Sequence, residues 1–188
     1  RIEDTIWITD SLFFDNYHDI MFAHDATQTV ATVWIANMRT DGPRHHCIVQ
    51  QSGAPIEDVW IVRPHIDAAG VADSGQWDAL SFGADVEWME IRAPVVRGGG
   101  VTRHAISRTG GTWTDCSLST VRSSGLTGSE LDGIVETDQT TRTLVNGWGT
   151  SDGDPSTTDE WKGAGQQGVS VYDTANGTKY TYINGAWR

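Results

Sequence analysis

Apolar-x-apolar triplets recur along this chain, separated by Gly-rich and polar stretches. The triplets are Ile6-Trp7-Ile8, Val33-Trp34-Ile35, Val59-Trp60-Ile61, Met89-Glu90-Ile91 and Cys116-Ser117-Leu118, with a degraded sixth copy at Arg142-Thr143-Leu144. The period is about 26 to 30 residues, which is typical of repeat architectures. Each triplet precedes a second apolar segment, and these segments are centred on Ile20, Ile48, Leu80, Ile106 and Ile134. Because such a unit cannot bury its apolar face alone, the pattern predicts units stacked as coils of a β-solenoid.

The alternation within each triplet predicts which side chains face the core. Successive side chains of a strand point to opposite faces, so the first and third positions point inward and the middle position points outward. The outward column is Trp7, Trp34, Trp60, Glu90, Ser117 and Thr143. A β-sandwich of regularly spaced strands is the alternative, but it does not account for apolar columns that keep one phase over five copies. We therefore expect an all-β solenoid of about five to six coils.

The two cysteines test this register. Cys47 belongs to the second coil and Cys116 to the fifth. Three coil spacings amount to about 14 Å, which is beyond the reach of a disulfide. Both cysteines are therefore expected to be free, buried and inert.

The coil length, the Val-Trp-Ile first strands and the Asp-Ala-Leu, His-Ala-Ile and Asp-Gly-Ile second strands resemble a known family. They are similar to right-handed, single-stranded parallel β-helices of the pectate-lyase-like type, found in polysaccharide lyases and hydrolases and in bacteriophage tailspikes. The resemblance covers residues 1–150 and implies an architecture rather than one enzyme. Strand-like sequence starts almost at Arg1, so we expect that upstream coils are missing from this sequence.

The last part of the chain has a different pattern. Residues 151–162 begin with a long polar run and predict a linker or turn. Residues 163–188 predict a small antiparallel β module, because segments 168–173 and 179–183 alternate across a turn and 184–185 is Asn-Gly. This module is expected to cap the open end of the helix. It also resembles the short terminal modules of phage tail-fibre proteins, which favours a virion appendage.

The composition limits the partners. The chain has 188 residues, and 25 acidic residues outweigh 13 basic ones, giving a formal net charge of -12. A basic surface is the usual mark of nucleic-acid or anionic-membrane binding, so neither partner is expected. No apolar run is long enough to insert into a membrane. No cofactor or metal is predicted; Asp152, Asp154 and Asp159 are of the type that binds calcium but form no complete calcium loop.

The chain contains 9 Trp, and three of them occupy the outward column. A stripe formed by Trp7, Trp34 and Trp60 is a surface that a lone monomer should not expose. One interpretation is a glycan platform, since indole rings pack on the C–H faces of sugars. The other is a subunit contact, because the resemblance to phage appendages implies a homotrimer of β-helices packed side by side.

A second column precedes the second strands and holds His18, His46, Asp78, His104 and Asp132. A straight column does not converge on one metal ion. We instead expect a polar ladder that satisfies backbone groups of the turns, with Asp78 and Asp132 buried and hydrogen-bonded.

Catalysis is the weaker possibility. Cleavage of a glycosidic bond needs an acid and a base on either side of it. Glu90 and Asp115 are the candidates, because one coil spacing and a two-residue offset separate them by about 8 Å, within the range for inverting enzymes. Arg92 is a candidate to hold a uronate. Whether the protein is an enzyme is left open.

The sequence therefore predicts a segment of a phage tail spike or fibre, located in the virion, that recognises a host-surface polysaccharide and contacts other tail proteins. A depolymerase of the same fold, either lyase or glycoside hydrolase, is the first alternative. A purely structural virion component is the second.

Overall fold

The computed structural model describes residues 5–25, 27, 30–134, 144–145, 148–151, 170–173, 178–183 and 186–188. Regular structure in these ranges consists of β-strands alone. No helix in the described part of the chain is long and apolar enough to cross a membrane.

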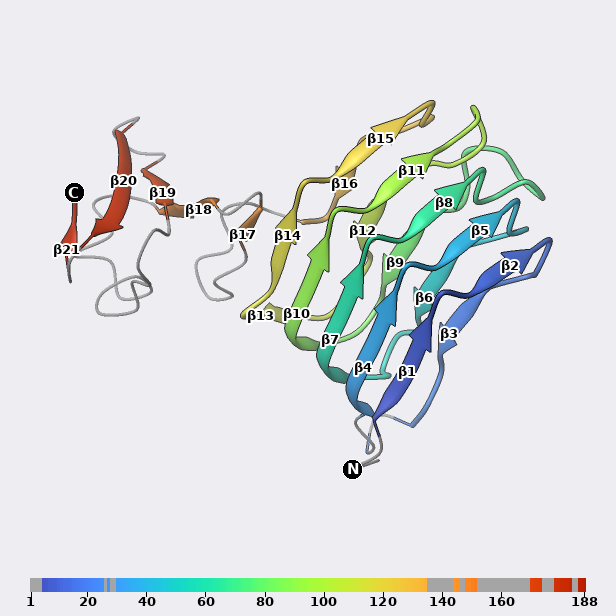
Figure 1. The fold of residues 1–188 in the computed structure, drawn as a ribbon, viewed down its shortest axis with the longest axis horizontal. Coiled ribbons are helices and arrows are strands. Elements are labelled where there is room, and N and C mark those ends of the chain that lie inside the picture. The colour runs from blue at the N-terminus through green and yellow to red at the C-terminus, as the bar shows by residue number, and fades with distance from the viewer. Residues whose placement is uncertain are drawn as a thin grey trace.

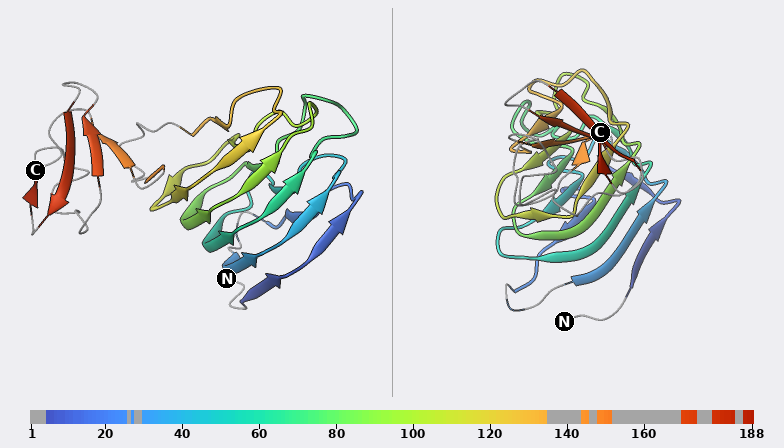
Figure 2. Two further views of the ribbon diagram at one scale, coloured as in Figure 1. Left: turned by 45° about the horizontal axis from the view of Figure 1, so that its top comes forward. Right: turned by 90° about the vertical axis from the view of Figure 1, so that its left-hand side faces the viewer.

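The strands form a parallel β-helix of about five turns, in which each coil contributes one strand to each of three sheets (Figure 1). The first sheet contains β1 (Ile6–Thr9), β4 (Val30–Ala36), β7 (Ile56–Val62), β10 (Val86–Arg92) and β14 (Ser117–Ser119), and β13 (Trp113–Thr114) also pairs with β10. The second contains β2 (Leu12–Phe14), β5 (Arg39–Asp41), β8 (His65–Asp67), β11 (Val95–Arg97) and β15 (Arg122–Ser124). The third contains β3 (Ile20–Phe22), β6 (Ile48–Gln50), β9 (Leu80–Phe82), β12 (Ile106–Arg108) and β16 (Leu131–Asp132). The coils wind in the right-handed sense, and the predicted fold class is confirmed (Figures 1 and 2).

The predicted register of the first sheet is confirmed. Ile6 pairs with Val33, Val33 with Val59, and Val59 with Met89. The side chains of Val33, Val59 and Met89 are almost fully buried, so this column faces the core as expected. Buried Ile35, Ile61, Ile91 and Leu118 form the second core column.

Two predicted copies are displaced. In the sixth triplet Leu144, instead of Thr143, pairs with Ser117; Thr143 itself lies outside the described residues. In the third sheet Leu131, instead of Ile134, pairs with Ile106. Gly133 explains the second displacement: it has φ +64 and approaches the Arg108 carbonyl so closely that a Cβ would lie 2.2 Å from its oxygen. Gly133 therefore occupies the corner after β16, and the strand begins earlier than expected.

The corners between the first and second sheets repeat one backbone conformation. The residues there have positive φ and are Asp10, Asn37, Arg63, Ala93 and Thr120. Each of the first four donates its backbone N–H to a carbonyl of the next coil, as Asn37 does to Val62 over 2.9 Å. The left-handed conformation costs a non-glycine residue about 1–2 kcal/mol, and the repeated inter-coil hydrogen bonds offset part of that cost.

Both cysteines are free and buried, as predicted. Burial raises the pKa of Cys116 to about 12 and raises the pKa of Cys47 well above its usual range. Thiols that remain protonated are poor nucleophiles. The absence of a bond between them agrees with the register of the coils.

The C-terminal strands pair mainly in the antiparallel sense. β17 (Leu144–Val145) pairs parallel with β14 and antiparallel with β18 (Trp148–Ser151). β18 pairs parallel with β19 (Ser170–Asp173), and β19 and β20 (Thr178–Ile183) form the predicted antiparallel pair. β21 (Ala186–Trp187) adds antiparallel to β20. The predicted linker at 151–162, apart from Ser151, lies outside the described residues.

The corners that directly follow the strands of the second sheet provide a stability prediction. Ala68 has φ +52, and glycine occupies the equivalent corners at Gly42 and Gly125. Ala68→Gly should raise the free energy of unfolding by up to about 1 kcal/mol, because glycine adopts this conformation without a steric penalty. Urea unfolding measures the change. Ala72→Gly is the matched control, because Ala72 is exposed and does not have positive φ. The control should be destabilising, and an equal loss in both variants would contradict the interpretation.

Candidate functional site

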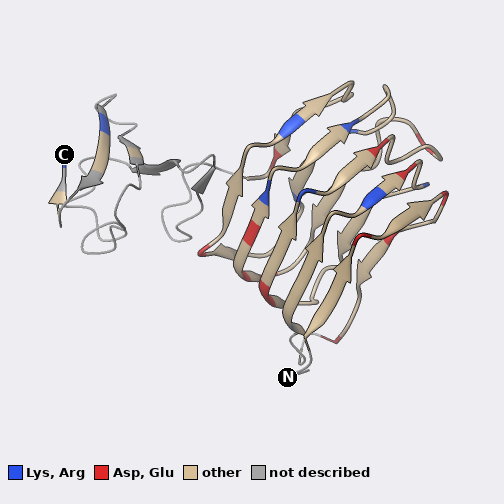
Figure 3. Cartoon of the chain, viewed as in Figure 1, with Lys and Arg blue, Asp and Glu red and all other residues tan. Residues whose placement is uncertain are grey.

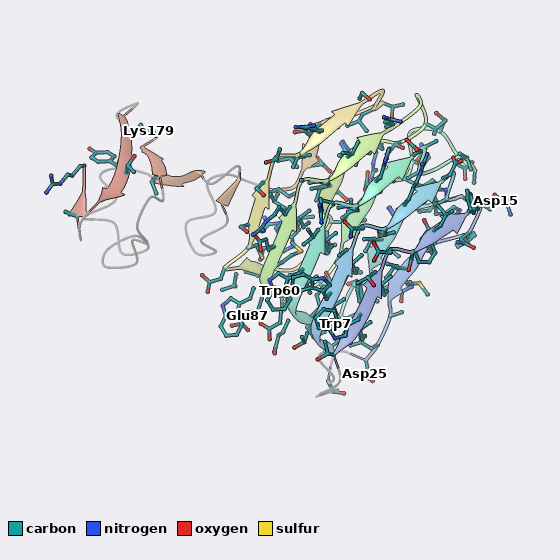
Figure 4. The ribbon with its side chains drawn as sticks, in the orientation of Figure 1. Trp7, Asp15, Asp25, Trp60, Glu87 and Lys179 are labelled. Atoms are coloured by element: carbon teal, nitrogen blue, oxygen red, sulfur yellow. The ribbon has the colours of Figure 1, made fainter. Side chains whose placement is uncertain are left out.

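The predicted tryptophan column forms a continuous stack on the outer face of the first sheet. Trp7 pairs in register with Trp34, and Trp34 with Trp60. The ring centroids of Trp7 and Trp34 are 5.5 Å apart with the planes inclined at 33°, and those of Trp34 and Trp60 are 5.6 Å apart at 32°. Trp7 is 64% exposed, and the other two are half-buried. We call these three residues the tryptophan stripe (Figure 4).

The surroundings of the tryptophan stripe are acidic. Glu57, Asp58 and Glu87 lie near the starts of the long strands β7 and β10, where Figure 3 shows acidic positions in red along the ribbon. Trp88 is a fourth indole near this face; it is 52% exposed and has φ +56. That conformation interrupts the alternation of β10, so Glu87 and Trp88 are both exposed although they are neighbours in sequence.

The structure places the catalytic candidates on this open face, each with a partner. Glu90 Oε1 accepts hydrogen bonds from Arg92 Nη2 at 2.5 Å and Arg92 Nε at 3.1 Å. Asp115 Oδ2 accepts one from Trp88 Nε1 at 3.2 Å. Neither carboxylate lines the groove described below. Among the described residues, the two hollows described below therefore offer no place where these carboxylates flank a sugar linkage.

The polar column before the third sheet forms the expected ladder in its middle coils. His46 Nδ1 lies 3.1 Å from the backbone N–H of Asp78, which it is placed to accept. His104 Nδ1 is in the same relation to the N–H of Ser129 at 3.0 Å. The fifth member is thus Ser129 and not Asp132. Asp132 was expected to be buried, but its side chain is 51% exposed, because the earlier start of β16 moves it past the turn.

Asp78 is the centre of a buried polar network. Its side chain is fully buried and accepts two hydrogen bonds of 2.8 Å from Arg103 and one of 2.7 Å from the Ser107 hydroxyl. Burial acts to raise the pKa of Asp78, but the hydrogen bonds from Arg103 and Ser107 outweigh it, so the pKa is lowered. The hydrogen bond to Asp78 raises the pKa of Arg103 in turn. Because both oxygens of the Asp78 carboxylate already accept hydrogen bonds, we assign this ion pair a structural role.

A second ladder, which the sequence analysis missed, lies one residue before the polar column. Tyr17, His45, Trp77 and Arg103 occupy equivalent positions in four consecutive coils. The rings of Tyr17 and His45 have centroids 3.8 Å apart, and those of His45 and Trp77 are stacked at 3.8 Å and 10°. In the sequence, these residues directly precede His18, His46, Asp78 and His104. They could have been aligned in this way, but four different residue types do not form a recognisable pattern.

This ladder borders a groove on the outer side of the third sheet. The groove has a volume of about 350 Å³, and Trp77 and Arg103 line it along with Gln76 and Ser81. A smaller hollow of about 260 Å³ adjoins it and shares Ser52, Gly83 and Gly111. Gly83 and Gly111 are required because a Cβ would lie 2.9 Å from the Gln50 carbonyl oxygen and 2.1 Å from the Ala84 carbonyl carbon, respectively. Close stacking of the coils at this corner therefore leaves the groove open.

The first coil has an unusually apolar exterior. Five large apolar side chains of this coil are between 51% and 64% exposed, and they project from all three sides: Trp7, Leu12, Phe14, Tyr17 and Met21. Exposed apolar side chains on this scale are unusual for the surface of a lone monomer.

Within the described residues no cluster of three or more His, Cys, Asp or Glu side chains is placed to hold a metal ion. The calcium candidates Asp152, Asp154 and Asp159 lie outside those residues.

Comparison of the chain with models of protein families, with curated proteins and with solved structures finds no significant match. The functional interpretation therefore depends on the geometry of the two surfaces.

The pair that Arg103 forms with the buried Asp78 should contribute far more stability than the pair that Arg92 forms with Glu90 at the surface. Arg103→Ala should lower the free energy of unfolding by about 3 kcal/mol, because it leaves the buried Asp78 carboxylate without its partner. Arg92→Ala should lower it by less than about 1 kcal/mol, since Glu90 lies at the surface. Denaturant unfolding of both variants measures this contrast. Similar losses would contradict the role assigned to Asp78.

The histidines of the polar column predict a loss of stability in acid. Burial lowers the pKa of His46 and His18 from the ordinary 6.5. The unfolded chain therefore binds protons at a higher pH than the native protein does, and stability is lost as the pH falls below about 6.5. In His46→Asn the slope of unfolding free energy between pH 6.5 and 5 should be smaller by up to about 1.4 kcal/mol per pH unit. An unchanged slope would show that His46 does not titrate differently on folding.

Proposed function

We propose that this chain is a segment of a virion appendage of the phage tailspike or tail-fibre type, and that it attaches to a host cell through a surface glycan. The observation that carries the proposal is the tryptophan stripe. Three indoles are stacked along the axis of the solenoid, with Trp7 64% exposed, and each indole combines an apolar ring with one N–H donor. Sugars offer apolar C–H faces and hydroxyl acceptors to match it.

The shape of the fold supports an extended ligand. The indole rings of successive coils have centroids 5.5 and 5.6 Å apart along the helix axis. A polysaccharide presents its units along a line, so several of them can contact one stripe at the same time. Contacts that are weak singly then add along the chain of the ligand.

We further propose that the appendage is a homotrimer that joins other tail proteins in the virion. The apolar exterior of the first coil supports this, because its exposed side chains lie on all three sides of the helix. In such a trimer part of the stripe contacts a neighbouring subunit, and glycan contacts are made by the indoles that stay accessible. A depolymerase role has less support, since Glu90 and Asp115 each have a neighbouring hydrogen-bond partner.

Trp34→Ala should reduce glycan binding without breaking the assembly. Trp34 contacts both other indoles, so its removal interrupts the stripe, and the affinity for a bound polysaccharide should fall at least about tenfold. An array of bacterial surface polysaccharides identifies the ligand, and calorimetric titration measures its affinity.

The control is Val71→Ala, which removes an exposed apolar side chain from a turn outside the first coil and the first sheet and should leave the affinity unchanged. Light scattering of both variants gives the oligomeric state. A Trp34→Ala protein that loses the trimer and shows the same glycan affinity would assign the stripe to subunit contact instead.

A further inference from the structure

We propose that the groove on the third sheet is a second binding site, separate from the tryptophan stripe, and that its ligand is an uncharged oligosaccharide. The groove is bounded on one side by the ladder that ends in Trp77 and Arg103. On the other side lie the turns around Ser52, Gly83 and Gly111. Together with the adjoining hollow it follows the helix axis over several coils, because its lining residues come from the second, third and fourth coils.

The lining of the groove is mixed. Trp77, His46 and Val49 contribute aromatic and apolar surface, as in most ligand pockets. The other side chains carry hydroxyl, amide and guanidinium groups, including those of Ser52, Gln76 and Thr109, all three of which are exposed. Such groups hydrogen-bond to hydroxyls, which a sugar carries on every face.

The charge of the groove excludes an anionic ligand. Arg103 is its one cationic side chain among the described lining residues, and both oxygens of the buried Asp78 carboxylate already bind it at 2.8 Å. The pair is neutral as a whole, and Asp85 at the adjoining hollow adds a negative charge. The chain has a formal net charge of -12, which further opposes a polyanion. A ligand with hydroxyls and no charge fits these features.

Trp77 provides a second reason to expect a sugar here. Its side chain lines the groove and is half-buried. Indole rings pack on the apolar C–H faces of sugars.

The glycine-lined side of the groove keeps this volume free of protein. Gly110 approaches the Gly83 carbonyl so closely that a Cβ would lie 2.9 Å from its oxygen. Side chains are therefore excluded along this corner, and backbone groups border the space. Close coil stacking forms this side of the groove, whereas the opposite side includes Gln76 and Trp77 of the turn at 68–79.

Saturation-transfer NMR tests the proposal with neutral tetrasaccharides of glucose, galactose and mannose, and with tetragalacturonate as the acidic comparison. At least one neutral probe should bind at millimolar concentration, and its signal should be unchanged between low and high salt, because no net charge is involved. Failure of all neutral probes, or binding of tetragalacturonate alone with strong salt dependence, would overturn the proposal.

The site is located by blocking it. Ser52→Tyr places a large side chain at the exposed margin of the groove and should weaken binding of the neutral probe at least tenfold. Ser124→Tyr is the matched control, because Ser124 is exposed at the end of β15 on the second sheet. Gln76→Ala, which removes an exposed amide without adding bulk, should weaken binding as well and guards against misfolding of the first variant. Equal binding by Ser52→Tyr and Ser124→Tyr would overturn the proposal.

The ligand class is shared with the proposed function, but the two can fail separately. If the groove is the site, Trp34→Ala binds the neutral probe as well as the natural protein does. If Trp34→Ala loses binding while Ser52→Tyr retains it, the tryptophan stripe is the glycan site and the groove is not.

Discussion

The parallel hydrogen bonds that hold each coil in register with the next determine every side-chain column of this protein. Three separate sheets connect consecutive coils, and a residue lies directly beside its equivalent at about 4.8 Å. Val33, Val59 and Met89 are therefore stacked in the core, while Trp7, Trp34 and Trp60 are stacked outside. A slip of one residue would exchange the two columns and bring the indoles inside. Burial of the aliphatic columns thus selects the register, and the exposed stack follows from it.

The first sheet is predictable from sequence because its inward triplet and the corner after it keep the same spacing in every coil. Each strand of the second sheet begins at a constant distance beyond the inward residue of the first, as Leu12 follows Ile6 and Arg39 follows Val33. The third sheet lacks this constraint. Apolar segments centred on Leu131 and on Ile134 both match the pattern, and the choice depends on the close approach of Gly133 to Arg108. That contact joins residues of different coils, so the pattern within one coil does not contain it.

The tryptophan stripe could be predicted from the sequence, and the groove on the third sheet could not, for a related reason. The tryptophan stripe repeats one residue type at one phase, so alignment of the triplets is enough to find it. The ladder beside the groove contains a phenol, an imidazole, an indole and a guanidinium, which have in common only that they are planar. Arg103 is moreover tied to Asp78, which belongs to the neighbouring column and the preceding coil. Both facts become visible only when the coils are placed on one another.

The turns between the second and third sheets differ greatly in length, from 15–19 in the first coil to 68–79 in the third, and Trp77 lies in the longest of them. The β-helix tolerates turns of different length because the strands on both sides of each turn keep their pairing with the neighbouring coils. Insertions at this one corner can thus alter the wall of the groove while the core columns stay as they are. The solenoid separates the part of the molecule that must remain constant from a part that is free to diversify, and a lineage of such proteins can change its ligand without having to refold its scaffold.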